Sequence, residues 1–126
     1  MQHQEFVLVA KSASASERAP LLRSLTTTAI RPNECYQNAL RICSANPGAN
    51  YVLGRVTVPG FGTIDHAWNS DEFGHFDATL ESRPDFSDCV YQAVVTLTSD
   101  QVQEMTFMGM PPTVYEVFMA VQNEAA

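Results

Sequence analysis

The chain has 126 residues, of which 45% are hydrophobic and 17% charged, so it is long enough to bury a core as one domain covering residues 1–126. Fourteen acidic residues against seven basic ones give a formal charge of -7. This balance excludes a general binder of nucleic-acid phosphates and disfavours adhesion to anionic membranes.

The cysteines indicate a reducing compartment. Three of them, Cys35, Cys43 and Cys89, are widely spaced and odd in number, which is a poor disulfide framework. The first residues lack a basic signal-peptide region, and the apolar run at 6–10 is too short to span a membrane. We therefore expect a cytoplasmic protein with free thiols.

The first part of the chain predicts a short strand at 6–9 and a modest helical stripe formed by Leu21, Leu22 and Leu25. A clearer helix follows. Asn33 is its expected N-cap, and Cys35, Ala39, Ile42 and Cys43 share one broad face at helical spacing. Asn46-Pro47-Gly48 is expected to end it.

The middle of the chain is rich in strand-forming residues. Runs at 51–58, 63–69 and 75–80 predict three strands, and the short connection at 70–74 predicts an antiparallel hairpin. Turns or loops are expected at 59–62 and 81–88, where they would form the rims of a cleft.

The last part predicts a strand at 90–97 and then a helix capped by Thr98-Ser99-Asp100 that carries Val102, Met105 and Met108. A final helix is expected over 114–121, although Thr113–Phe118 also fits a strand. Together these elements predict an α+β fold. A small antiparallel sheet packs on the cysteine-bearing helix, and a further helix lies at the C-terminus.

Cys35, His66 and Asp77 are the residues that point to a reaction. Cys35 stands near a helix N-terminus, where free N–H groups and the helix dipole favour a thiolate, although Glu34 opposes this. His66 lies on a strand face with Ile64 and Trp68, where it is partly desolvated. If Asp77 is the direct or diagonal partner of His66 in the hairpin, its carboxylate can orient the imidazole. A one-residue shift in the strand register would instead put the two side chains on opposite faces of the sheet.

Other readings of these residues stay open. Cys35 and His66 can be ordinary core residues, and His75 can replace His66 as the base. A zinc site built from the cysteines, histidines and Asp77 lacks zinc-like spacing, so we expect neither a metal nor a cofactor.

The run His66-Ala67-Trp68, followed after a short turn by Phe76-Asp77-Ala78-Thr79, resembles the HAW…D-x-T signature of transglutaminase-like proteins. These belong to the papain-like cysteine superfamily, and small phage and bacterial proteins share the pattern. The resemblance covers residues 33–80 and implies a Cys35 nucleophile, a His66 base and an orienting Asp77. True transglutaminases carry a tryptophan just before the cysteine, which this chain lacks, so protein crosslinking is disfavoured.

An acyl-transfer site also needs an oxyanion hole. The N–H of Cys35 is one natural donor, and Asn33, Gln37 or Asn38 can supply the second, while Trp68 forms a wall of the core or the cleft. The function expected is therefore a cysteine-dependent amide or acyl hydrolase or transferase acting on a protein or peptide. The alternative is a non-enzymatic phage or bacterial protein that binds a host protein through its acidic surface. Either is expected as a monomer or a small homo-oligomer.

Overall fold

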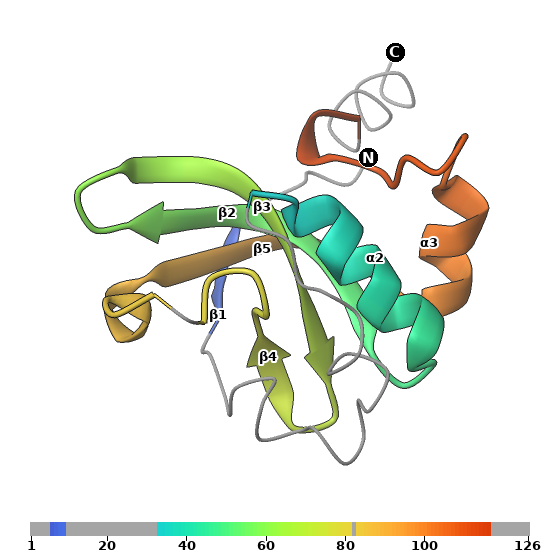
Figure 1. Ribbon diagram of the computed structural model, residues 1–126, viewed down its shortest axis with the longest axis horizontal. Coiled ribbons are helices and arrows are strands. Elements are labelled where there is room, and N and C mark those ends of the chain that lie inside the picture. Colours follow the sequence, from blue (N-terminus) through green and yellow to red (C-terminus); the bar gives the residue numbers. More distant parts are fainter. Residues whose placement is uncertain (1–5, 10–32, 82, 117–126) are drawn as a thin grey trace.

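The described chain forms one curled antiparallel sheet with helices packed on it (Figure 1). The computed structural model describes residues 6–9, 33–81 and 83–116. The strand order is β1-β5-β2-β3-β4. The strands are β1 (Val7–Val9), β2 (Asn50–Val58), β3 (Gly62–Asp71), β4 (Gly74–Phe76) and β5 (Val90–Leu97). The predicted α+β class is thereby confirmed.

Two helices accompany the sheet. The cysteine-bearing helix α2 (Cys35–Ala45) lies across one face and contacts β3 most extensively, and α3 (Ser99–Met105) packs beside it (Figure 1). A short 3₁₀ helix, Phe86–Asp88, precedes β5. Neither α2 nor α3 is long and apolar enough to cross a membrane.

Two predicted helical segments are not covered by these elements. The stripe at 21–25 lies outside the described residues, as does the final predicted helix beyond position 116. The described start of that last segment, 114–116, forms a helical turn.

The sequence predicts the C-terminal end of α2 correctly, but not its N-cap. Asn33 was expected to be the N-cap, but this prediction is wrong: the N-cap is Glu34, which makes no side-chain capping hydrogen bond. Asn33 instead adopts a left-handed conformation with φ of 64°, which asparagine tolerates better than most residues. The helix ends as predicted, because the N–H of Asn46 bonds to the carbonyl of Ile42.

Helix α3 begins as predicted and ends earlier than expected. Thr98 accepts a hydrogen bond from the N–H of Gln101, whose side chain bonds back to the N–H of Thr98 in a capping box. The helix stops at Met105, so Met108 is not part of it. Met108 lies in a tight turn between Phe107 and Met110, with φ of 53°.

The hairpin of β3 and β4 forms, but β4 is short. β2 and β3 pair along their whole shared length, whereas β4 pairs only with the last part of β3, Asn69–Asp71. The strand expected at 75–80 ends at Phe76, because the next residue, Asp77, accepts hydrogen bonds from the N–H groups of Thr79 and Leu80 and turns the chain. This early end leaves the first part of β3 without a strand on that side among the described residues.

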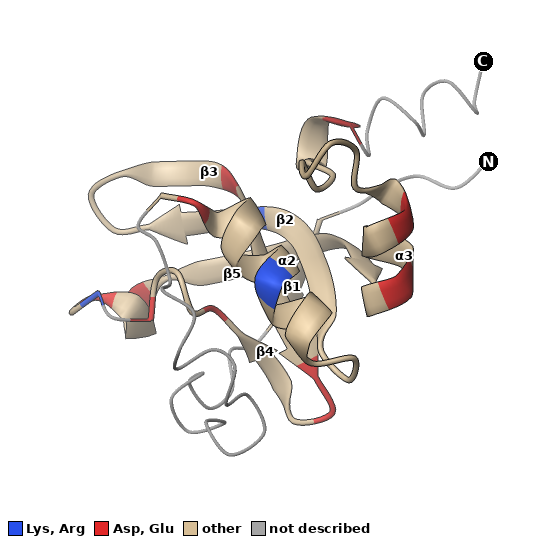
Figure 2. Ribbon diagram, turned by 45° about the vertical axis from the view of Figure 1, so that its right-hand side comes forward, with Lys and Arg blue, Asp and Glu red and all other residues tan. Residues whose placement is uncertain are grey.

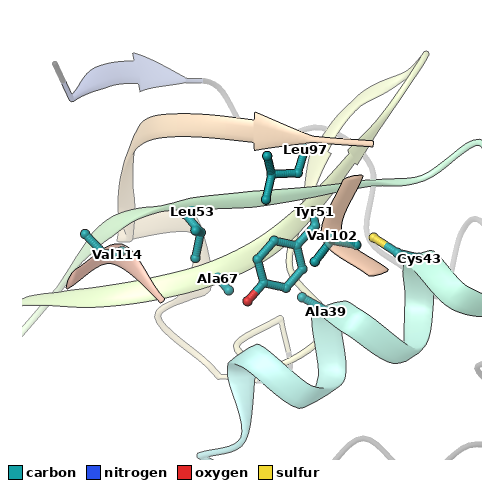
Figure 3. Close-up of a cluster of buried hydrophobic side chains, with 8 residues drawn as sticks. All are labelled: Ala39, Cys43, Tyr51, Leu53, Ala67, Leu97, Val102 and Val114. Atoms are coloured by element: carbon teal, nitrogen blue, oxygen red, sulfur yellow. The ribbon is translucent and has the colours of Figure 1, made fainter. Parts of the chain in front are cut away.

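The sheet buries different side chains on its two faces. The face under α2 and α3 holds an apolar cluster, and Figure 3 shows how it is shared between the strands, both helices and Val114: Ala39, Cys43, Tyr51, Leu53, Ala67, Leu97, Val102 and Val114. The opposite face carries larger aromatic rings under the chain segment 80–89: Val52, Val56, Val58, Trp68, Cys89 and Tyr91. His66 lies on this second face, two residues before Trp68 on the same strand.

Candidate active site

His66 and Asp77 are joined in the interior of the protein. The His66 Nε2 lies 2.7 Å from the Asp77 Oδ2, and each residue is only 2% exposed. Their meeting follows from the hairpin register. Asn69 pairs with Phe76, so the next position places Asp77 beside Trp68, diagonal to His66 on the same face.

Four donors surround the Asp77 carboxylate. Oδ2 accepts from His66 and from the hydroxyl of Tyr91 at 2.6 Å, while Oδ1 accepts from the N–H groups of Thr79 and Leu80 at 3.0 and 3.4 Å. Burial raises the pKa of Tyr91 far above its usual value, and the neighbouring carboxylate raises it further, so the hydroxyl remains a donor. The other three donors therefore fix the carboxylate in position, and the carboxylate in turn orients the imidazole of His66.

Aromatic rings pack against the imidazole of His66. The rings of His66 and Trp68 are stacked with centroids 6.1 Å apart, and Trp68 meets Tyr91 edge-on at 5.0 Å. Trp68 is 1% exposed, so it is a buried support for His66 and has no surface to offer a substrate. Its Nε1 donates to the Nδ1 of His75 at 3.0 Å, and burial lowers the pKa of His75. The Nδ1 of His75 is thus engaged in a hydrogen bond with Trp68.

A glycine makes room for this stack. Gly54 on β2 lies directly opposite His66 and next to a β-bulge. A Cβ there would meet the carbonyl oxygen of Gln92 at 2.0 Å and the Trp68 ring at 2.8 Å. Only glycine lets the indole lie this close to the backbone.

Cys35 approaches the same imidazole from the first residue of α2. It is half-buried, and it lies close enough to His66 to help raise the pKa of the imidazole, in addition to the bond with Asp77. Asp77 occupies the Nε2 of the ring, which leaves Nδ1 for other partners. The structure therefore brings the side chains of Cys35, His66 and Asp77 into one neighbourhood.

The charge state of His66 reflects these two neighbours. Burial lowers its pKa, but attraction to Asp77, the hydrogen bond with Asp77 and the interaction with Cys35 outweigh this and raise the pKa to about 10. At neutral pH the ring therefore carries a proton.

Three side chains were expected to complete an oxyanion hole, and two of them are engaged elsewhere. Gln37 donates to the carbonyl of Gly109 at 3.0 Å, which holds the 107–110 turn against α2. Asn38 is 1% exposed; its amide donates to Thr79 at 3.0 Å and accepts from Arg41 at 3.1 Å.

Asn33 is the member of the set that remains at the surface, one residue before the N-cap. The N–H groups of the first helical turn have no intrahelical acceptor, and Glu34 does not cap them with its side chain. Of the three side chains expected as oxyanion donors, Asn33 is thus the one that is exposed and has no hydrogen bond to another described residue.

The other two cysteines lie in apolar surroundings. Burial raises the pKa of Cys43 to about 12, against a smaller lowering by its hydrogen bond with Asn69. Cys89 is 3% exposed under the segment 80–89. The Cys43 thiol is therefore protonated at neutral pH, and both thiols are buried.

The two loops expected to form cleft rims meet each other. The guanidinium of Arg83 lies over the Phe61 ring at 5.1 Å and is paired with Asp85 at 2.8 Å, so the 81–88 loop reaches the tip of the β2–β3 hairpin. A separate pocket of about 480 Å³ lies at the other end of α2, lined by 45–49 and 71–73, away from Cys35. Within the described ranges no three metal-binding side chains converge.

The contacts of three site residues, Tyr91, Thr79 and Gly54, were not anticipated from the sequence, although Thr79 belongs to the D-x-T signature. Tyr91 reaches Asp77 from 14 positions away on another strand, and no local pattern could reveal this. Thr79 had a signal, because an Asp-x-Thr sequence forms the side-chain-to-backbone turn seen here. A lone glycine inside the apolar run 51–58 also had a signal, since it often marks a bulge or a close approach.

Comparison of the chain with protein-family models, with curated proteins and with solved structures gave no match. The function must accordingly be argued from the geometry and chemistry of the site itself.

Proposed function

We propose that the protein is a cysteine-dependent amide or acyl hydrolase or transferase, in which Cys35 is the nucleophile. One observation carries the proposal: a buried imidazole is held by a fully bonded carboxylate and also interacts with a half-buried thiol. The resemblance of His66-Ala67-Trp68 and Asp77-Ala78-Thr79 to transglutaminase-like proteins supports the same reading. Free thiols in a reducing cytoplasm would keep Cys35 available.

The first half of the reaction forms an acyl-enzyme. The Cys35 thiolate attacks the substrate carbonyl, forming a C–S bond and an oxyanion. The intermediate collapses as the bond to the leaving group breaks, and His66 donates its proton to the departing amine or thiol. The N–H of Cys35 and the Asn33 side chain would stabilise the oxyanion.

The second half releases the acyl group. Neutral His66 takes a proton from water or from an amine, which attacks the thioester, and the C–S bond breaks to restore the thiolate. Asp77 keeps the ring in the orientation and tautomer that both halves need. Tyr91 and the turn at Thr79 hold Asp77 in place throughout.

Alkylation by iodoacetamide over a pH series, read by peptide mass spectrometry, tests the nucleophile. At neutral pH we expect Cys35 to react at least about tenfold faster than Cys43 and Cys89, and we expect the advantage to disappear in His66→Ala. Equal reactivity of the three thiols in the folded protein would refute the proposal.

A second measurement tests acyl transfer itself. The protein is mixed with an activated thioester, and the intact mass is followed for an adduct that appears and then decays. An adduct on Cys35 that decays more slowly in Asp77→Asn supports the triad. Cys43→Ala, which removes a buried thiol, is the matched control and should behave like the parent protein.

A non-enzymatic binding protein is the second candidate, and the exposed apolar side chains after α3 favour it. Phe107, Met108 and Met110 are 75%, 86% and 63% exposed on one short turn, as expected of a partner-binding surface. Cys35→Ser separates the two candidates: a biological effect that survives this change with the fold intact favours binding over catalysis.

A further inference from the structure

Among the described residues, the first half of β3 has no strand on its outer side, and this open edge leads directly to the proposed site. β3 pairs with β2 from Gly62 onward, but its other side pairs with β4 only over Asn69–Asp71. Residues 62–65 are exposed, and His66 follows them at once. Exposed strand edges of this kind pair readily with another extended chain, and natural proteins usually cover or blunt them.

The pairing pattern identifies the backbone groups that face outward. Asp71 pairs with Gly74 across a two-residue turn, so the N–H and C=O of Asp71 point toward β4. In a regular ladder these groups alternate in direction, and β3 is regular from 62 to 70. The N–H and C=O of Thr63 and Asp65 therefore point to the open side.

Acidic side chains surround the point where this edge meets Cys35. Glu34 adjoins Cys35 in sequence, and Asp65 adjoins His66. The pKa of Tyr36, beside Cys35, is raised to about 12, first by burial and then by the charges of Cys35, Asp65 and, more weakly, Glu116. Figure 2 shows acidic segments both on β3 and immediately before α2.

The cations of the described chain are engaged in other contacts. Arg41 donates to Asn38, Arg83 pairs with Asp85, and the Arg55 guanidinium lies over the Phe6 ring at 3.4 Å. Arg55 is opposite Asp65 in the ladder and offsets part of its charge. Glu34 and Glu116 form no ion pair with the three cations of the described residues, so the described side chains around the thiol are mainly acidic.

We propose that the open edge of β3, residues 62–65, binds an extended, positively charged peptide and delivers its reacting carbonyl to Cys35. Backbone hydrogen bonds to Thr63 and Asp65 would fix the extended conformation, as in other cases of strand addition. The carboxylates of Glu34 and Asp65 would select lysine or arginine side chains of the peptide. This inference rests on the proposed function and specifies its substrate class.

Electrophilic peptides test it directly. Two pentapeptide vinyl sulfones, one rich in lysine and one rich in glutamate, are compared for their rate of addition to Cys35, with iodoacetamide as a reference without charge or peptide backbone. We expect the lysine peptide to react at least about fivefold faster at low ionic strength, and the ratio to shrink toward one in about 1 M salt.

Two variants separate charge from backbone pairing. Asp65→Asn should lower the ratio by about twofold, whereas Asp65→Pro, which also removes an outward N–H, should slow both peptides by a further factor of about five. An N-methylated lysine peptide tests the same hydrogen bond from the ligand side if Asp65→Pro does not fold. Glu104→Gln, an exposed carboxylate on α3, is the matched control and should change neither rate.

The outcomes distinguish the two proposals. A Cys35 that does not react with iodoacetamide overturns the proposed function, and this inference falls with it. A Cys35 that reacts with iodoacetamide but does not discriminate between the peptides, or an N-methylated peptide that reacts as fast as its parent, overturns this inference alone.

Discussion

Cys35 and Cys43 stand about two turns apart on the same helix, yet their surroundings have opposite character. Cys35 is half-buried at the first residue of α2, beside the imidazole of His66. Cys43 is fully buried in the apolar cluster of Figure 3, where Asn69 donates a hydrogen bond to its sulfur and Ser99 donates one to its carbonyl. Residue type alone therefore does not decide what a thiol does.

The difference comes from where each thiol lies relative to the sheet. The middle of α2 packs flat on the apolar face, and Asn69 ties it there by donating to the carbonyl of Ala39 at 3.1 Å and to that of Asn50 at 2.9 Å. The N-terminal end carries the half-buried Cys35, which interacts with the buried imidazole of His66. One end of the helix thus contributes to stability, and the other can take part in chemistry.

Replacing each of these two cysteines with alanine should give the largest difference in acyl turnover. Cys35→Ala should abolish iodoacetamide labelling and reduce acyl turnover by more than about a thousandfold, because the nucleophile is lost. Cys43→Ala should leave turnover intact and cost about 1 kcal/mol of unfolding free energy through a small cavity. Intact-mass kinetics and urea titration measure the two effects, and a loss of turnover in well-folded Cys43→Ala would contradict the comparison.

Gly54→Ala should produce the next largest effect, on stability. The new Cβ would overlap the backbone carbonyl of Gln92, which cannot move without breaking the β2–β5 ladder, so we expect a loss of at least about 3 kcal/mol. Gly48→Ala is the control, since nothing lies within 4 Å of its added Cβ. Urea unfolding of both variants is the measurement, and equal stability of the two would show that the stack under His66 is loosely packed.

Tyr91→Phe removes one donor from the buried Asp77 carboxylate without changing the packed ring. Because a buried charged acceptor loses a hydrogen bond, the free energy of unfolding should fall by about 2 kcal/mol. Turnover should also fall, by about tenfold, as Asp77 loses its fixed position. Val90→Ala, at an exposed neighbouring position, should alter neither; the idea fails if Tyr91→Phe is as stable and active as the parent.

The raised pKa of His66 predicts how stability varies with pH. Its pKa in the folded protein is about 10, above the usual value of 6.5, so the folded state holds a proton that the unfolded chain has lost. The stabilisation is complete below about pH 6.5 and is lost as the pH rises through about 10, with a slope of about 1 kcal/mol per pH unit between. Urea titrations across this range should show the slope, and Asp77→Asn should flatten it.

Gln37→Ala should have the smallest effect and sharpens the assignment of the oxyanion donors. The bond from Gln37 to Gly109 is exposed, so its loss should cost about 0.5 kcal/mol and loosen the 107–110 turn. Acyl turnover should be unchanged, whereas Asn33→Ala should lower it by about tenfold or more. The reverse ranking would exchange the roles of Gln37 and Asn33.

Much of the fold could be predicted because its local signals agree. The runs at 51–58, 63–69 and 90–97 carry strand-forming residues bounded by turn residues, and β2, β3 and β5 follow them closely. Thr98 capped its helix as predicted because a capping box is contained in four consecutive residues. The errors lie at boundaries: Glu34 replaced Asn33 as the N-cap, and β4 ended at Phe76 when the carboxylate of Asp77 captured the following N–H groups.

The sequence by itself determined the order of strands and helices, the hairpin that puts Asp77 within reach of His66, and the helix that begins at Cys35. These follow from patterns within a dozen residues, where periodicity and turn chemistry act. Only the tertiary structure decided that Tyr91 bonds to Asp77 and that Gln37 and Asn38 are engaged elsewhere. Those contacts join residues far apart in the chain, and their free energy depends on the packing of the whole sheet, which no local pattern encodes.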